Sequence, residues 1–236
     1  MINRKKKNLK VIAKMKRPLN QGISHDPLEN ANILNRHFAS IGNRLASDLP
    51  SSDKSFRDYL PLNVPSCSFV FDPVIPSEIE FEIMLTPENK SHGLYSCPTR
   101  LLKCSRHIIS APLAILINNS VRMGIFPYKL KHVKIIPIFK DGVFIDLQKA
   151  FDTVNHSILL HKLSHYGIRG IVNDWFSSYL ANRIQTTQVG PHVSKKESTL
   201  CGVPQGSVLG PLLFLIYVND IYMASDKLTI YLIRTN

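Results

Sequence analysis

The sequence lacks the features that direct a protein out of the cell or into a membrane. Its four cysteines form no Cys-x-x-Cys pair and have no histidines at zinc-ligand spacing, so they are typical of free thiols in a reducing compartment. The charged N-terminus has no apolar signal core, and the longest apolar run, 211–218, is too short to span a bilayer. We expect an intracellular protein, in the nucleus or cytoplasm, without a membrane partner. Nothing in the sequence indicates an oligomer.

Acidic residues are scarce as well. Asp and Glu number 17 against 29 Lys and Arg, which gives a net charge of +12. Such a balance favours a polyanionic partner such as RNA or DNA, although a generically basic protein has the same composition. At 236 residues and 44% hydrophobic, the chain is long enough to bury a core in one or two domains.

The N-terminal residues 1–29 are predicted to be a basic, flexible arm. Its lysines are candidates for weak, non-specific contacts with nucleic-acid phosphates: Lys5, Lys6, Lys7 and Lys10. A solvated tail or a nuclear-import signal is the alternative interpretation of the same residues.

Hydrophobic spacing predicts strands alternating with helices along the rest of the chain. Helices are expected over 31–49, 77–85 (with Ser77 and Glu80 as a capping box), 98–107, 111–123, 155–167, around 175–180 and from 207 to about 221. Strands are expected over 66–74, 133–139, 143–147, 185–189, 198–201 and 228–233, with a linker over 50–65. This alternation indicates an α/β or α+β sheet with helices packed on one face.

A tight turn is predicted at Asp141-Gly142, between the apolar runs 133–139 and 143–147. Asp and Gly tolerate the positive φ angles of a two-residue hairpin. We therefore expect the two runs to pair antiparallel.

Two strings carry the residues that could act chemically. The first string is Val-Phe-Ile-Asp-Leu-Gln-Lys-Ala-Phe-Asp, 143–152. Its residues 143–147 are predicted to form a buried strand that carries Asp146 near its C-terminal end, and a helix-prone segment follows. The second string, 202–220, is a Gly/Pro loop that opens into an apolar helix. Taken alone, a single Asp at a strand end is usually a capping or turn residue. Asp152 and His156, which share a predicted helix face, are more typical of a surface pair than of a metal site.

Together these strings closely resemble the palm of a reverse transcriptase of the non-LTR (LINE-like) retrotransposon type. The resemblance extends from about residue 30 to the C-terminus and includes the Asn-Lys-Ser-His-Gly turn at 89–93. It implies a helical linker and the start of the polymerase region over 30–140, and a partial palm over 141–236. It also implies an RNA-directed DNA polymerase ancestry, with RNA and DNA as partners.

The resemblance assigns roles to individual positions. Asp146 would bind Mg²⁺ and Leu147 would supply a backbone carbonyl, since magnesium prefers hard oxygen ligands. Phe151 would lie under the nucleotide sugar. Gln205 and Gly206 would line the nucleotide and template pocket.

The sequence departs from the family pattern in two places. Lys140 is separated from the strand at Val143 by Asp141 and Gly142 alone, so the fingers segment is missing. Where the family has Tyr-Ala-Asp-Asp, the two Asp positions hold Ile233 and Arg234. From where the sequence starts and stops we also expect no thumb and no upstream endonuclease.

A polymerase needs carboxylates to hold two metal ions. We therefore predict a reverse transcriptase fragment, internally deleted and C-terminally truncated, that is catalytically defective. The alternatives are a non-enzymatic nucleic-acid-binding remnant and a retroelement relic with no selected function.

Overall fold

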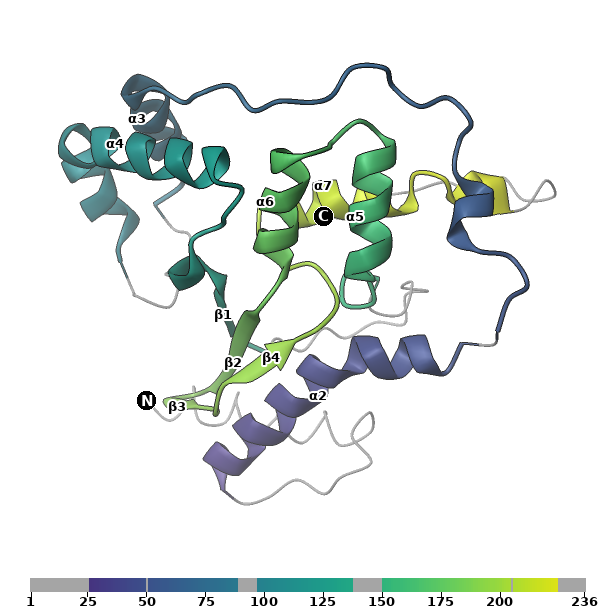
Figure 1. Ribbon diagram of the computed structural model, residues 1–236. Helices are drawn as coiled ribbons and strands as arrows, with labels where there is room; N and C mark the ends of the chain where they lie inside the picture. The colour runs from purple at the N-terminus through teal and green to yellow at the C-terminus, as the bar shows by residue number, and fades with distance from the viewer. Residues whose placement is uncertain (1–25, 50, 89–96, 138–149, 205, 225–236) are drawn as a thin grey trace.

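The computed structural model describes residues 26–49, 51–88, 97–137, 150–204 and 206–224. These residues form a mixed α/β structure with a small sheet, the long helix α2 packed on it, a cluster of three short helices, and a further pair of helices that pack against each other (Figure 1). The predicted fold class is confirmed. The predictions for the Asp141-Gly142 turn, the strands 143–147 and 228–233 and the turn at 89–93 lie outside the described residues.

The sheet is built around β2 (Arg183–Val189). On one edge β2 pairs in parallel with β1 (His132–Ile135), and on the other it pairs antiparallel with β3 (His192–Val193) and β4 (Glu197–Thr199). Gly190, at a φ of 62°, allows the tight turn between β2 and β3. The strands predicted at 133–139, 185–189 and 198–201 are confirmed with shifted ends, and residues 138–139 lie outside the described part.

Helix α2 (Pro27–Ser47) covers one face of this sheet. It begins where Asp26 accepts a hydrogen bond from the Leu28 backbone N–H at 3.0 Å, and Pro27 occupies its first turn. Both features are typical of helix starts. The helix predicted over 31–49 is therefore confirmed, with an earlier start and an end at Ser47.

A buried polar network, rather than apolar packing alone, ties α2 to the sheet. The Asn35 side chain is 0% exposed and donates to the carbonyls of Gln185 (3.3 Å) and Lys195 (2.8 Å). Its Oδ1 accepts from the Gln185 amide at 3.2 Å and the Thr187 hydroxyl at 3.0 Å. Every polar atom of this amide has a partner, as burial requires. The network thereby sets how α2 lies on the sheet.

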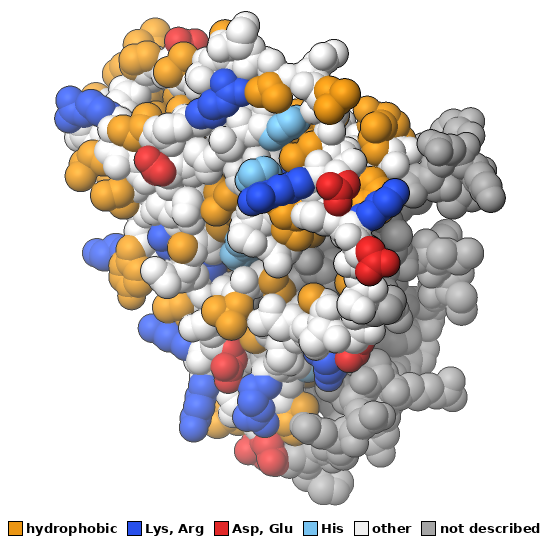
Figure 2. Space-filling model, turned by 45° about the vertical axis from the view of Figure 1, so that its right-hand side comes forward, with side chains coloured by type: hydrophobic (Ala, Val, Ile, Leu, Met, Phe, Trp, Pro, Cys, Tyr) orange, Lys and Arg blue, Asp and Glu red, His pale blue; other side chains and the backbone are white. Residues whose placement is uncertain are grey.

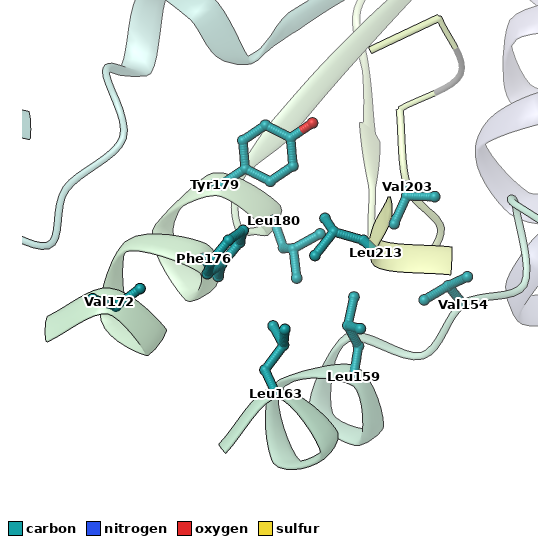
Figure 3. Packing of buried hydrophobic residues seen from close by; sticks show 9 residues of the cluster. All are labelled: Val154, Leu159, Leu163, Val172, Phe176, Tyr179, Leu180, Val203 and Leu213. Carbon is teal, nitrogen blue, oxygen red and sulfur yellow. The ribbon is translucent and has the colours of Figure 1, made fainter. Parts of the chain in front are cut away.

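The main hydrophobic core lies among α5 (His156–His165), α6 (Ile171–Leu180) and α7 (Leu209–Val218). Figure 3 shows these side chains pointing toward one another. The cluster consists of Val154, Leu159, Leu163, Val172, Phe176, Tyr179, Leu180, Val203 and Leu213. The predicted helices 155–167, 175–180 and 207–221 correspond to α5, α6 and α7.

Two of the helix predictions need correction. The segments 98–107 and 111–123 form one continuous helix, α4 (Thr99–Arg122), which keeps Pro112 in its interior. Helix α3 (Pro76–Leu85) begins before Ser77, and Glu78 rather than Glu80 accepts from the backbone N–H at its start. Glu80 instead pairs with His107 at 2.8 Å, because α3 packs against α4.

The strand predicted over 66–74 is wrong. These residues form no strand, and one backbone bond, from Phe69 N–H to the Gly167 carbonyl (2.8 Å), links them to the core region. Their alternating apolar residues serve ring packing instead: Phe71 meets Trp175 edge to face at a centroid distance of 5.6 Å. The linker predicted over 50–65 contains a short 3-10 helix, η1 (Phe56–Tyr59).

The described residues include no helix that combines the length and apolarity needed to cross a membrane. The four cysteines, all of which are described, are free, as the sequence predicts: Cys67, Cys97, Cys104 and Cys201.

Candidate functional site

The described residues include part of the predicted site. Phe151 and Gly206 are described. The other predicted positions lie outside the described residues: Asp146, Leu147, Gln205, Ile233 and Arg234, together with Lys5, Lys6, Lys7 and Lys10. Their roles remain predictions.

The two motif strings, distant in sequence, lie side by side in the structure. The Gly202 N–H donates to the Val154 carbonyl and the Val203 N–H to the Phe151 carbonyl, both at 2.8 Å. The Cys201 thiol donates to the Asp152 carbonyl at 3.3 Å. These bonds hold the Gly/Pro loop against residues 151–154, the turn that leads into α5.

Phe151 is half-buried, and its ring stacks on Phe214 of α7 with centroids 4.7 Å apart and planes at 28°. The ring therefore joins the edge of the main core. A role under a nucleotide sugar is not tested by this geometry. The packing of Phe151 on Phe214 connects the first string to α7, the helix of the second string.

Asp152 and His156 are not a pair on one helix face, contrary to the sequence interpretation. Asp152 lies in the turn before α5, and His156 is the first residue of that helix. The His156 Nε2–H donates to the Gly202 carbonyl at 2.7 Å. Burial lowers the pKa of His156. The hydrogen bond to Gly202 acts in the opposite direction, and the nearby charge of Arg183 lowers the pKa further. A neutral histidine thus helps to fasten the two strings together.

Two glycines make this close approach possible. Gly202 has a φ of +84°, and a Cβ there would lie 2.9 Å from Asp152 Cα and from the Phe151 carbonyl oxygen. On α2, a Cβ at Gly42 would lie 2.0 Å from the Asp152 carbonyl oxygen and 2.5 Å from Cys201 Sγ. The sequence analysis did not identify a role for Gly42. A sequence shows that a helix contains a glycine, but it does not show that this glycine lies against Asp152.

The Gly/Pro loop enters α7 through Ser207. Its hydroxyl donates to the Pro204 carbonyl at 2.7 Å and accepts from the Gly210 N–H at 2.9 Å. The Tyr179 hydroxyl donates to the same oxygen at 3.2 Å. At Gly206, whose φ is +79°, no described residue beyond its chain neighbours lies within 4 Å of where a Cβ would be. The loop is therefore crowded at Gly202 and open at Gly206.

At the far end of α7, Asp220 is 4% exposed and forms an ion pair with Lys162 of α5. The Lys162 ammonium also donates to the Tyr217 carbonyl at 2.6 Å. Because this carboxylate is buried and neutralised by Lys162, it is not available as a metal ligand. Sequence spacing gave no signal that these two residues meet.

Among the described residues, no group of three or more His, Cys, Asp or Glu side chains could hold a metal ion. Asp146 lies outside that part of the chain, so the predicted magnesium position is untested. Burial, followed by the nearby Asp152, raises the pKa of the Cys201 thiol, against the opposing hydrogen bond with the Asn43 backbone.

The chain resembles known proteins over this same region. The profile of the family described as "Reverse transcriptase (RNA-dependent DNA polymerase)" matches residues 92–232. A probable RNA-directed DNA polymerase from transposon BS of Drosophila melanogaster is 38% identical over 87 residues, covering 34% of this chain and 9% of that protein. The RNA-directed DNA polymerase from the mobile element jockey is 37% identical over 82 residues, with 34% and 8% coverage; it too is from Drosophila melanogaster.

A Pol polyprotein from the type-1 retrotransposable element R2 of Popillia japonica is 33% identical over 79 residues, covering 34% of this chain and 13% of that protein. The matches thus span about a tenth of the length of these curated relatives. They confirm the resemblance to non-LTR retrotransposon polymerases. Since the family profile extends over more than half of the 236 residues, the chain belongs to the reverse transcriptase (RNA-dependent DNA polymerase) family.

Proposed function

We propose that this chain is a reverse transcriptase domain fragment that does not polymerise DNA and that binds RNA and DNA without sequence preference. The absence of polymerisation is inferred from the residues that stand at the predicted metal-ligand positions. Asp146 is present, whereas Ile233 and Arg234 stand where the family pattern has two aspartates. We place the protein inside the cell, in the nucleus or cytoplasm.

The charges at these positions do not fit the divalent ions that the family uses. Two metal ions and a triphosphate need several carboxylate oxygens. A unit positive charge at ~4 Å, with an effective dielectric of 20, repels another by ~4 kcal/mol, and a dication by twice that. Asp220, the acid at the end of the second string, is neutralised by Lys162, which supports the proposal by removing one replacement ligand.

The second half of the proposal follows from the net charge of +12. Lysine and arginine bind the phosphate backbone of any sequence by releasing condensed counterions. Figure 2 shows basic side chains distributed over one face of the molecule rather than gathered in a single patch. Such a distribution favours weak, sequence-independent binding.

Primer extension on an RNA template tests the loss of catalysis. We expect no incorporation by the purified chain with Mg²⁺ or with Mn²⁺, because two of the three ligand positions lack a carboxylate and the segment between Lys140 and Val143 is too short for the fingers. The matched control is Asp146→Ala. Incorporation by the natural chain that Asp146→Ala abolishes would refute the proposal and would mean that another carboxylate serves the metals.

Binding at different salt concentrations tests the remaining function. We expect weak binding to both RNA and DNA, with an affinity that falls steeply between ~50 and ~200 mM salt. Fluorescence anisotropy with labelled oligonucleotides of unrelated sequence is the measurement. Absence of binding at low salt, or an affinity independent of salt, would contradict nucleic-acid binding and would leave the absence of polymerisation standing.

A further inference from the structure

A small cavity beside the β1–β2 pair is lined mainly by basic side chains. Its volume is about 100 Å³. The lining residues come from the 3-10 helix η2 (Tyr128–Lys131), β1, β2 and the segment before β4: Tyr128, Lys129, Lys131, His132, Ile184 and Lys196. None of them belongs to the polymerase motifs of the sequence.

Lys131 is the residue that makes this cavity unusual. Lys131 is 7% exposed, and its ammonium donates a long hydrogen bond to the Ser178 hydroxyl at 3.5 Å, its one partner among the described residues. No described carboxylate lies within ion-pair distance of it. Burial, with the nearby Arg183 adding to it, lowers the pKa of Lys131. A buried cation without an anion is costly, so among the described residues the site lacks the negative charge that would balance Lys131.

Other basic side chains surround Lys131. The His132 ring contacts the Thr186 hydroxyl at 3.3 Å, and burial, followed by Lys196, lowers the pKa of His132. Lys129 and Lys196 are exposed at the cavity. Within the described ranges, the ion pairs lie elsewhere, at His107–Glu80 and Lys162–Asp220. The cavity therefore concentrates positive charge, and its described lining contains no carboxylate to balance it.

An aromatic ring stands next to these cations. Tyr128 lines the cavity and is 70% exposed. A basic cleft beside an exposed ring is the combination used to bind single strands, in which cations hold the backbone and the ring stacks on an unpaired base.

We propose that this cavity binds one phosphate of a single-stranded nucleic acid, with a neighbouring base stacked on Tyr128. The assignment rests on the nucleic-acid binding proposed above and names a place for it. Lys131 contacts the phosphate from inside the cavity, and Lys129 and Lys196 contact it from the rim. Duplexes, whose bases are already stacked, do not use the ring.

The test uses the full chain and short labelled RNA of mixed sequence, as single strand and as duplex, together with inorganic phosphate. Lys131→Met removes the inner cation, and Lys129→Gln with Lys196→Gln removes the two rim cations without disturbing buried packing. The control carrying the same charge change is Lys54→Gln with Lys103→Gln, outside the cavity.

We expect the Lys131→Met variant to bind single-stranded RNA about tenfold to a hundredfold more weakly, the usual worth of a charge-assisted hydrogen bond. The slope of log affinity against log salt should fall by about 1 for each lost phosphate contact. Tyr128→Ala should weaken single-strand binding about tenfold and leave duplex binding unchanged. Inorganic phosphate should compete with RNA for the natural chain and not for Lys131→Met.

If the cavity variants and the control variant bind RNA with the same affinity, the cavity assignment would be overturned. Non-specific binding would remain intact. No RNA binding by the natural chain would overturn both. Phosphate binding that depends on Lys131, without any effect of Lys131→Met on RNA, would reassign the cavity to a free anion. Equal losses of single strand and duplex on Tyr128→Ala would remove the stacking role.

Discussion

Replacing Lys162 by methionine is expected to lower the free energy of unfolding by about 3–5 kcal/mol. The substitution keeps most of the side-chain volume and removes the charge that neutralises Asp220. Since Asp220 is 4% exposed, its carboxylate would stay buried without a counterion. Urea denaturation followed by circular dichroism measures the loss.

The geometry at Lys162 explains why this effect is large. The ammonium pairs with Asp220 Oδ1 and donates to the Tyr217 carbonyl at 2.6 Å, and it lies 5.2 Å from the centroid of the Tyr217 ring. Asp220 Oδ2 is buried without a hydrogen-bond partner in the described structure. Removal of the lysine therefore leaves the aspartate with no compensating interaction.

Two further variants separate the ion pair from a general loss of packing. Lys162→Met combined with Asp220→Leu should recover most of the lost stability, because an apolar pair of similar volume often replaces a buried ion pair without cost. Lys54→Met, at an exposed site, should change stability by less than ~0.5 kcal/mol. A double variant as unstable as Lys162→Met would show that the lysine acts through shape and not through charge.

Replacing Gly202 by alanine is expected to cost about 2–5 kcal/mol, the sum of two effects. A residue with a Cβ pays ~1–2 kcal/mol in the left-handed region, and Gly202 has a φ of +84°. The new Cβ would also lie 2.9 Å from Asp152 Cα and carbonyl oxygen, and overpacking of this kind costs ~1–3 kcal/mol. Neither backbone atom can move without breaking the bonds that join the two motif strings.

Gly206 provides the matched control in the same loop. Its φ is +79°, and no atom of a described residue beyond its chain neighbours lies within 4 Å of the position of an added Cβ. Gly206→Ala should therefore show the backbone cost alone, ~1–2 kcal/mol. The difference between the two midpoints in urea measures the crowding at Gly202. Equal losses would mean that the contact between the strings contributes nothing to stability.

Much of the secondary structure was predictable, because helix and strand type depends on local spacing. Asn155 precedes an apolar stripe, and its side chain accepts from the N–H groups of Ser157 and Ile158 at 3.0 and 3.2 Å to start α5. Errors arose where tertiary packing outweighed a local signal. Pro112 lies inside α4 because α3 packs along that helix, and Phe71 belongs to an aromatic cluster instead of a strand.

The sequence by itself determined the family and gave the prediction for the metal-ligand positions. Both depend on the order of residues in the chain: the strings 143–152 and 202–220, and Ile233 and Arg234, which are predicted to stand in register with a carboxylate pair. Such patterns need no knowledge of distances in space.

Only the tertiary structure decided which residues act on one another. Asn35 bonds to Gln185 and Thr187, about 150 residues away, and Gly42 meets Asp152. Among the described residues, Lys131 is buried without a carboxylate partner, whereas Lys162 has Asp220, although the sequence presents both as ordinary lysines. The physical reason is that a buried polar group depends on its partner across the fold, and residue spacing along a chain does not encode that partner.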